Sequence, residues 1–219
     1  MNLEQARFNM IEQQIRPWEV LDQTVLDTFS VIPRELFVPK QHRTLAFADV
    51  EIPLGHGEHM MFPRVEGRML QALAITPQDT CLEIGTGSGF ITACMAHLSK
   101  HVDSIERYED FTRQAAERLL SLRLRNHTLY TDDALRSLPT QQRYDVIAVT
   151  GSVPYTIPQF EQQLAVGGRL FVVIGCGATM QATLVKRETE VEFSRTALFE
   201  TYLTPLVGVD DSAERNFVF

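Results

Sequence analysis

Residues 82–90, Leu-Glu-Ile-Gly-Thr-Gly-Ser-Gly-Phe, decide the fold of this 219-residue chain. The apolar run Thr80–Ile84 predicts a buried parallel strand, and the pattern of Ile91–Leu98 predicts a helix. Glycines at alternate positions, beginning with Gly85, connect the two. A strand that turns on glycines into a helix lets a ligand approach bare backbone at a helix N-terminus. The stretch therefore predicts a nucleotide-type site.

Strand and helix patterns alternate after this turn. We expect further strands at 102–106, 128–130, 144–149 and 169–174, and helices at 111–122 and 159–164. Strands separated by helices predict a parallel sheet with helices on both faces. The tail from 183 to 202 alternates in the manner of antiparallel edge strands. The fold class expected is α/β, with a mostly parallel seven-stranded sheet and a Rossmann-like arrangement.

The N-terminal part of the chain is predicted to be largely helical. We expect helices at 2–16, ended by Pro17, at 22–29 with Asp22 as N-cap, and at 64–75. A short turn is expected at 33–37, and a loop rich in Gly, His and Pro at 53–63. The chain is interpreted as one domain, in which residues 1–76 form a helical cap with an acceptor loop and residues 77–219 form the core.

Composition narrows the class of protein. Apolar residues make up 44% of the chain and charged residues 22%, as in globular proteins that work in water. The net charge of −8 argues against a general nucleic-acid binder. The three cysteines have no metal-like spacing, and Cys81 and Cys94 are expected in the core. We expect a cytoplasmic protein with neither membrane nor nucleic-acid partners, and leave the oligomeric state open.

The details of the glycine turn favour one nucleotide over another. A dinucleotide site prefers Gly-x-Gly-x-x-Gly, but here the third glycine, Gly89, comes one place early. Glu83 at the strand end would repel a pyrophosphate and attract a sulfonium or an ammonium group. Glu83-x-Gly85-x-Gly87-x-Gly89 resembles motif I of the Rossmann-like methyltransferases, which implies S-adenosylmethionine as the cofactor. A dehydrogenase remains a distant alternative.

Acidic residues also end the next two predicted strands. Glu106 stands where an acid accepts hydrogen bonds from ribose hydroxyls. Asp132 is placed to accept a hydrogen bond from the adenine amino group, while Asp133 is equally suited to cap a helix. Thr150 ends the fourth strand, at the edge where open α/β sheets bind ligands. The cofactor-binding set predicted is Glu83, Gly85, Thr86, Gly87, Ser88, Gly89, Glu106, Arg107, Asp132, Asp133 and Thr150.

Segments along the whole chain carry a family resemblance. They are Ile11–Arg16, Val31–Pro39, Leu82–Phe90, Ser104–Arg107, Tyr144–Gly151, Gln163–Leu170 and Pro205–Gly208. In this order they resemble the protein-L-isoaspartate O-methyltransferases. The resemblance implies methylation of the carboxylate of isoaspartyl residues in damaged proteins, which initiates repair through a succinimide. A protein or peptide substrate is the partner implied.

One loop departs from the family pattern Gly-x-Gly-Gln-Thr-Ile-Ser-Gln-Pro. The aligned stretch of this chain is Gly55-His56-Gly57-Glu58-His59-Met60-Met61-Phe62-Pro63. The Thr position is His59, the Ser position is Met61 and the second Gln position is Phe62. The family Ser is tied to the reaction, so its replacement by Met61 puts the isoaspartyl acceptor in question. His59 and Met61 are the candidate residues at the reacting end.

Several interpretations of this loop stay open. His59 is the one loop residue suited to act as a general base toward an amine or hydroxyl acceptor, but closing a turn or stacking on Phe62 is the preferred interpretation. Met61 either lines an acceptor pocket or packs under the loop. His56, Glu58 and His59 suggest zinc, but no helix fixes them and no fourth ligand is near, so no metal is expected. The alternatives to isoaspartyl repair are a methyltransferase for another acceptor, such as a small molecule, and an S-adenosylmethionine-binding module without catalysis.

Overall fold

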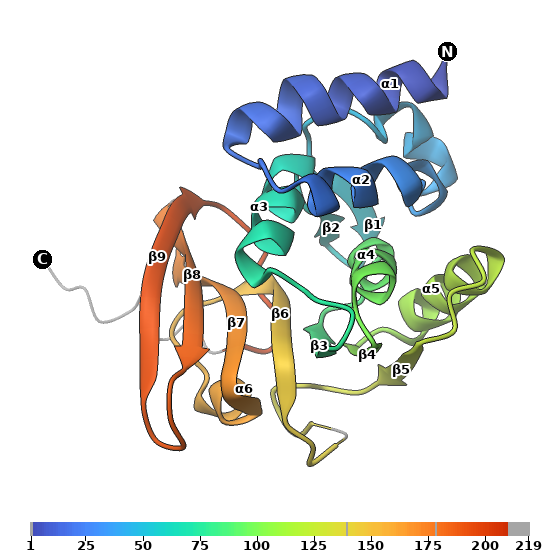
Figure 1. Cartoon of the computed structure of the whole chain (residues 1–219). Helices are drawn as coiled ribbons and strands as arrows, with labels where there is room; N and C mark the ends of the chain where they lie inside the picture. Colours follow the sequence, from blue (N-terminus) through green and yellow to red (C-terminus); the bar gives the residue numbers. More distant parts are fainter. Residues whose placement is uncertain (1, 139, 178, 210–219) are drawn as a thin grey trace, which may run out of the picture.

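A twisted seven-stranded sheet forms the C-terminal part of the computed structural model, which describes residues 2–138, 140–177 and 179–209 (Figure 1). The strand order is β5-β4-β3-β6-β7-β8-β9. The strands are β3 Thr80–Ile84, β4 His101–Glu106, β5 His127–Thr131, β6 Tyr144–Val153, β7 Leu164–Cys176, β8 Thr179–Arg187 and β9 Phe193–Thr201. The first five pair in parallel, whereas β8 and β9 pair antiparallel. The α/β Rossmann-like fold and its antiparallel tail are therefore confirmed.

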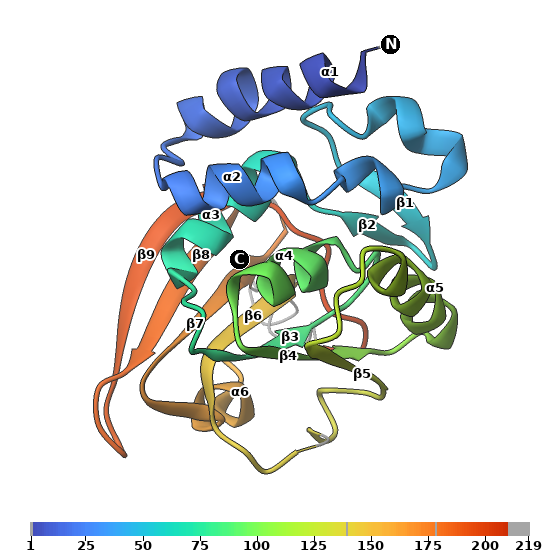
Figure 2. The ribbon, with the colours of Figure 1, turned by 45° about the vertical axis from the view of Figure 1, so that its right-hand side comes forward.

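The two faces of the sheet bury separate sets of side chains because neighbouring residues of a strand point to opposite faces. Cys81 and Val146 belong to a core shared with the N-terminal helices. Leu82 and Ile147 belong to a second core on the other face, together with Phe160. Helices α4 Phe90–Leu98 and α6 Pro158–Gln162 accordingly lie on opposite sides of the sheet (Figure 2).

The N-terminal helices form a cap over α4 (Figure 2). They are α1 Leu3–Met10, the π-helical turn Ile11–Ile15, α2 Gln23–Val31, α3 Pro63–Leu73 and the 3₁₀ turns Arg16–Trp18, Arg34–Leu36 and Lys40–Leu45. Asp22 caps α2 as predicted, because its side chain accepts a hydrogen bond from Thr24 N. Pro17 does not end the first helix; it lies inside a 3₁₀ turn, where its fixed φ suits the first turn of a helix. No helix in the described part of the chain has the length and apolarity of a membrane span.

The prediction of a loop at 53–63 is wrong, because a β-hairpin occupies most of this segment. Strands β1 Ile52–Gly55 and β2 Glu58–Met60 pair antiparallel, with Ile52 opposite Met60. The turn uses two residues with positive φ, His56 at 54° and Gly57 at 84°. Ile52 and Met60 are buried in the cap core, so tertiary packing stabilises strands too short to give a periodic sequence signal.

The helix predicted at 159–164 is also shifted, since α6 ends at Gln162 and β7 begins at Leu164. The strand therefore includes Gly168, which was expected to lie after a helix. A Cβ on Gly168 would lie 2.9 Å from the carbonyl oxygens of Ala165 and Tyr144. Glycine is needed here because the two backbones approach closely, not because a helix ends.

Gly89 ends the decisive turn and begins α4 under two constraints. Its φ is +84°, and a Cβ there would lie 2.8 Å from the Cβ and 3.2 Å from the Cα of Ala115 on α5 Glu109–Ser121. The left-handed conformation and the contact with α5 each require glycine. Gly89 thus sets the distance between the two helices next to the turn.

We predict that Gly89→Ala lowers the free energy of unfolding by about 3 kcal/mol, the sum of left-handed strain and overpacking. Gly167→Ala is the matched control, because Gly167 has a φ of +82° and a Cβ there would meet nothing within 4 Å. The control should cost only about 1 kcal/mol. Urea denaturation of both variants measures the difference; equal losses would contradict the packing role of Gly89.

Candidate active site

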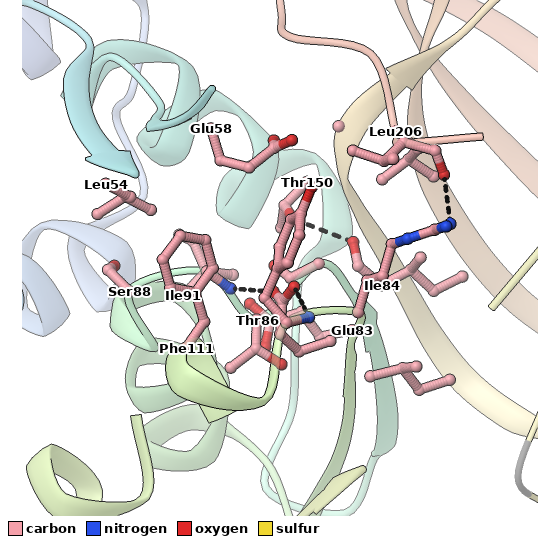
Figure 3. A pocket seen from close by; sticks show the side chains of 18 of the residues that line it. Leu54, Glu58, Glu83, Ile84, Thr86, Ser88, Ile91, Phe111, Thr150 and Leu206 are labelled. Atoms are coloured by element: carbon pink, nitrogen blue, oxygen red, sulfur yellow. Dashed lines mark hydrogen bonds between the residues drawn. The ribbon is translucent and has the colours of Figure 1, made fainter. Parts of the chain in front are cut away.

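A cleft lies at the carboxyl ends of β3, β4, β5 and β6, under the β1–β2 hairpin (Figure 3). The residues predicted from the sequence line it, with one exception. Gly89 does not line the cleft, because its backbone faces Ala115 and Phe37. Contact between Gly89 and the cofactor stays a prediction, while the structure shows that Gly89 packs closely against α5.

Glu106 joins the ends of β3 and β4. It is buried at 6% exposure, and its carboxylate accepts hydrogen bonds from the backbone N–H of Gly87 at 2.8 Å and of Tyr108 at 2.9 Å. Burial raises the pKa of Glu106 above its ordinary value, and these amide bonds offset only part of the rise. Gly87 leaves the approach open, since a Cβ there would meet only Leu54 Cδ1, at 3.3 Å. A carboxylate and bare backbone thus face the same space.

Glu83 lies beneath the turn with one oxygen paired and one unpaired. One carboxylate oxygen accepts hydrogen bonds from the hydroxyls of Thr92 and Ser104. The other oxygen, Oε1, is buried and has no partner among the described residues. Burial raises the pKa of Glu83 to about 8, and the nearby Glu106 contributes to the rise. A buried carboxyl with an unmet oxygen is suited to a cationic group in the cleft.

The hydroxyls of the turn bond within the protein. Thr86 Oγ1 pairs with Ser104 Oγ, and Ser88 Oγ accepts from Phe90 N at 3.2 Å. These bonds fix the turn before any ligand enters. The backbone of the turn is bonded as well, since Thr86 N–H donates to Ile105 O at 3.3 Å and the Ser88 carbonyl accepts from Arg118 at 2.8 Å.

The end of β5 carries the pair of aspartates that the sequence left open. Asp132 is exposed, and its N–H donates to Glu106 O at 2.9 Å, which fixes it beside the end of β4. Asp133 caps a turn, since its side chain accepts from Leu135 N at 3.1 Å. Asp133 also accepts from Arg107 at 3.0 Å. Asp132 therefore keeps the freer carboxylate of the two.

Thr150 does not end the fourth strand as predicted, because β6 continues to Val153, but it does line the cleft. Its hydroxyl donates to the carbonyl oxygens of Ile84 at 3.0 Å and Gly85 at 2.5 Å. The hydroxyl thereby joins β6 to the end of the adjacent strand β3. Beyond it, Leu206 covers Gly151, where a Cβ would come within 2.6 Å of the leucine side chain. Contact between Thr150 and a cofactor stays a prediction.

The cap forms the opposite wall of the cleft. Leu54, Glu58 and Met61 line it from the hairpin and the residue after it, and His59 stands at the rim with an exposed side chain. Met61 is buried at 4% exposure and presents an apolar surface where the family pattern has a hydroxyl. His59 and Met61 thus lie in one cleft with the predicted cofactor residues.

A buried arginine holds this wall in place. Arg34 is fully buried and pairs through two nitrogens with the Glu66 carboxylate, at 3.0 and 3.1 Å. It also donates to the carbonyl oxygens of Ala46 and Met61, each at 2.9 Å. Because Glu66 lies on α3 and lines the cleft, this network fixes the backbone of Met61 against the cap.

His56 takes no part in a loop cluster with Glu58 and His59. Its ring stacks on Tyr108 at 4.1 Å between centroids, and its Nε2 lies 3.1 Å from the Asp110 carboxylate. These contacts attach the tip of the hairpin to the start of α5. Among the described residues, no group of three or more His, Cys, Asp or Glu side chains has the geometry of a metal site.

Sequence reasoning missed several residues of the cleft. Tyr108, Phe111, Leu54 and Leu206 line it, and Glu58 was weighed only as a metal ligand. Tyr108 follows Glu106 by two positions, which is the one signal that pointed to it. Phe111 lies on α5, a predicted helix, but the pattern did not show that it faces the cleft. Leu54, Glu58 and Leu206 depend on the hairpin and on the segment after β9, whose placement the sequence pattern did not reveal.

Comparison with known proteins assigns the family. Residues 5–211 match the family model described as protein-L-isoaspartate(D-aspartate) O-methyltransferase. The chain belongs to the protein-L-isoaspartate O-methyltransferase family. The protein-L-isoaspartate O-methyltransferase 2 of Pelobacter propionicus is 34% identical over 210 residues, covering 95% of this chain and 93% of that protein. The Koribacter versatilis relative is 35% identical over 202 residues, covering 92% and 90%.

Solved structures of the same family share the fold. One, from Plasmodium falciparum, is described as a protein-L-isoaspartate O-methyltransferase and was crystallised with S-adenosyl-L-homocysteine. Its TM-score is 0.80 at 18% identity, and the match covers 94% of this chain and 98% of that chain. A second protein-L-isoaspartate O-methyltransferase has a TM-score of 0.81 at 23% identity and covers 96% and 69%. The predicted family and Rossmann-like fold are both confirmed.

The raised pKa of Glu83 predicts a pH dependence of stability in the ligand-free protein. Between its ordinary value of 4.5 and about 8 the folded state binds more protons than the unfolded state. The contribution of this group is therefore fully present below 4.5 and is lost as pH rises toward 8. We expect Glu83→Gln, which does not titrate, to gain stability relative to the unmodified protein between about pH 5.5 and about pH 8. Urea denaturation at both pH values measures it; an unchanged difference would refute the assignment.

Proposed function

We propose that this chain is an S-adenosylmethionine-dependent methyltransferase that methylates the carboxylate of isoaspartyl residues in proteins and peptides. The observation that carries the proposal is the glycine turn with Glu83, Glu106 and Asp132 at three adjacent strand ends, in a member of this family. Carboxyl groups attract positive charge, and glycine backbone lets a ligand come close. Both features suit a methyl donor that carries a sulfonium, an ammonium and a nucleoside.

On the donor side, each strand end serves a different part of the ligand. S-adenosylmethionine supplies, when bound, a methyl group on a positively charged sulfur. Glu106 is placed to accept hydrogen bonds from ribose hydroxyls, and Asp132 to accept one from the adenine amino group. Glu83 stabilises positive charge above the turn through its unpaired oxygen. The further roles of Arg107, Asp133 and Thr150 rest on their place in the cleft lining.

On the acceptor side, the chemistry needs little beyond positioning. A carboxylate is ionised near pH 7, so no general base is required for its oxygen to bond to the methyl carbon. The cap wall with Leu54 and Met61 excludes water, and Arg34 keeps the Met61 backbone in place. We assign the acceleration to this orientation.

The proposal also includes the domain organisation, the partners and the cellular compartment of the protein. We infer one domain, with residues 1–76 as cap and 77–219 as core, whose last residues 210–219 lie outside the described structure. The acceptor is a protein or peptide, and neither nucleic acid nor membrane is a partner. A reducing cytoplasm suits the buried thiols of Cys81 and Cys94.

A second candidate is methylation of a different acceptor. Met61 offers no hydroxyl to an isoaspartyl carboxylate, and His59 is exposed at the cleft rim, where it can take a proton from an amine or hydroxyl. A third is a donor-binding protein without catalysis, which the same loss of the Ser favours.

The acceptor is tested by incubating the protein and S-adenosylmethionine with an isoaspartyl peptide, with the matched aspartyl peptide as control. We predict release of S-adenosylhomocysteine with the isoaspartyl peptide only, and His59→Ala should retain activity within about twofold because a carboxylate needs no base. Turnover of an amine that is lost in His59→Ala would support the second candidate. Donor binding without turnover of any acceptor would support the third.

A further inference from the structure

Glu58 presents an unpaired carboxylate to the acceptor side of the cleft. It lies on β2, is half-buried and lines the cleft. Its side chain makes no hydrogen bond or ion pair with any described residue. Figure 3 shows it extending over the cleft, above Thr150 and Thr86. A carboxylate thus stands on the wall that faces the donor residues.

The surrounding charges leave Glu58 uncompensated. Arg107 in the cleft lining and Arg34 and Arg64 in the cap each already have an acidic partner. The pairs are Arg34–Glu66, Arg64–Asp49 and Arg107–Asp133. Burial raises the pKa of Glu58 and the charge of Glu106 raises it further, while His59 and His56 lower it. The acceptor end of the cleft therefore attracts positive charge.

This charge is a departure from the family loop. In the aligned pattern Gly-x-Gly-Gln-Thr-Ile-Ser-Gln-Pro, Glu58 occupies the first Gln position. A neutral amide has become a carboxylate of nearly the same shape, and further along the same loop Met61 stands where the pattern has a hydroxyl. An isoaspartyl carboxylate entering this space would be repelled unless a positive group accompanied it.

We propose that Glu58 is a specificity-determining residue that selects isoaspartyl peptides in which a lysine or arginine flanks the isoaspartyl residue. The inference rests on the proposed function. The positive side chain pairs with the Glu58 carboxylate while its long stem lies along the apolar surface of Leu54 and Met61. The positive charge also offsets the repulsion between Glu58 and the acceptor carboxylate. Glu58 itself takes no part in bond making.

The test measures binding separately from turnover. The protein is saturated with S-adenosylhomocysteine, and the affinities of two labelled isoaspartyl peptides, one flanked by lysine and one by glutamate, are compared by fluorescence anisotropy. We expect roughly fivefold tighter binding of the lysine peptide at low salt, as for a partly screened ion pair. High salt should reduce the preference.

Three variants assign the preference to Glu58. Glu58→Gln should abolish it and Glu58→Lys should invert it, with the affinity for S-adenosylhomocysteine unchanged by calorimetry. Glu51→Gln is the matched control, because Glu51 is a half-buried carboxylate without a hydrogen-bond partner beside the same hairpin but outside the cleft lining. Glu51→Gln should keep the preference of the unmodified protein.

The possible outcomes separate this inference from the proposed function. Equal affinities for the two peptides, no binding of either, or a preference that survives in Glu58→Gln would overturn the role of Glu58. A Glu58→Gln variant that loses affinity for S-adenosylhomocysteine would also overturn it, by placing the residue on the donor side. Methyl transfer without a charge preference leaves the proposed function intact, whereas a charge preference in binding without any methyl transfer supports Glu58 and removes the repair activity.

Discussion

The bond between the Glu106 carboxylate and the Gly87 amide is the constraint on which the site depends. It joins the turn after β3 to the end of β4, and the Asp132 N–H joins the end of β5 to the Glu106 carbonyl. Three strand ends are thus connected in sequence at one edge of the sheet. The link forms only because parallel strands end together and because the turn is glycine, so that its amides are reachable.

The core was predictable because its signals are local. The strand Thr80–Ile84 has the bounds that its apolar run indicated. Glu106 ends β4 as expected, and Asp132 directly follows β5. The hairpin 52–60 was not predictable, since its strands are held by burial of Ile52 and Met60 against the distant cap. The sequence also does not show what a side chain or a glycine contacts. The Thr150 hydroxyl bonds to backbone carbonyl oxygens, and Gly89 allows two helices to pack closely.

The donor side and the acceptor side of the cleft are built from different parts of the chain. The residues of one side can therefore change while those of the other are kept. The carboxyls and glycines of the donor side follow strands of the core, whereas Glu58 and Met61 belong to the cap. Arg34 and Glu66 hold the backbone of the cap wall in place whatever side chains that wall carries, because Arg34 bonds to the carbonyl oxygen of Met61. Changes at His59, Met61 and Glu58 therefore alter acceptor choice while the frame persists.

Calorimetric titration with S-adenosylhomocysteine tests the central claim most directly. The unmodified protein should bind it at one site, and Glu106→Gln should weaken binding by roughly tenfold or more, the loss expected for a charged hydrogen-bond acceptor. Glu109→Gln, an exposed acid at the start of α5, is the control and should bind as the unmodified protein does. Absence of binding, or equal affinity in Glu106→Gln, would contradict the account.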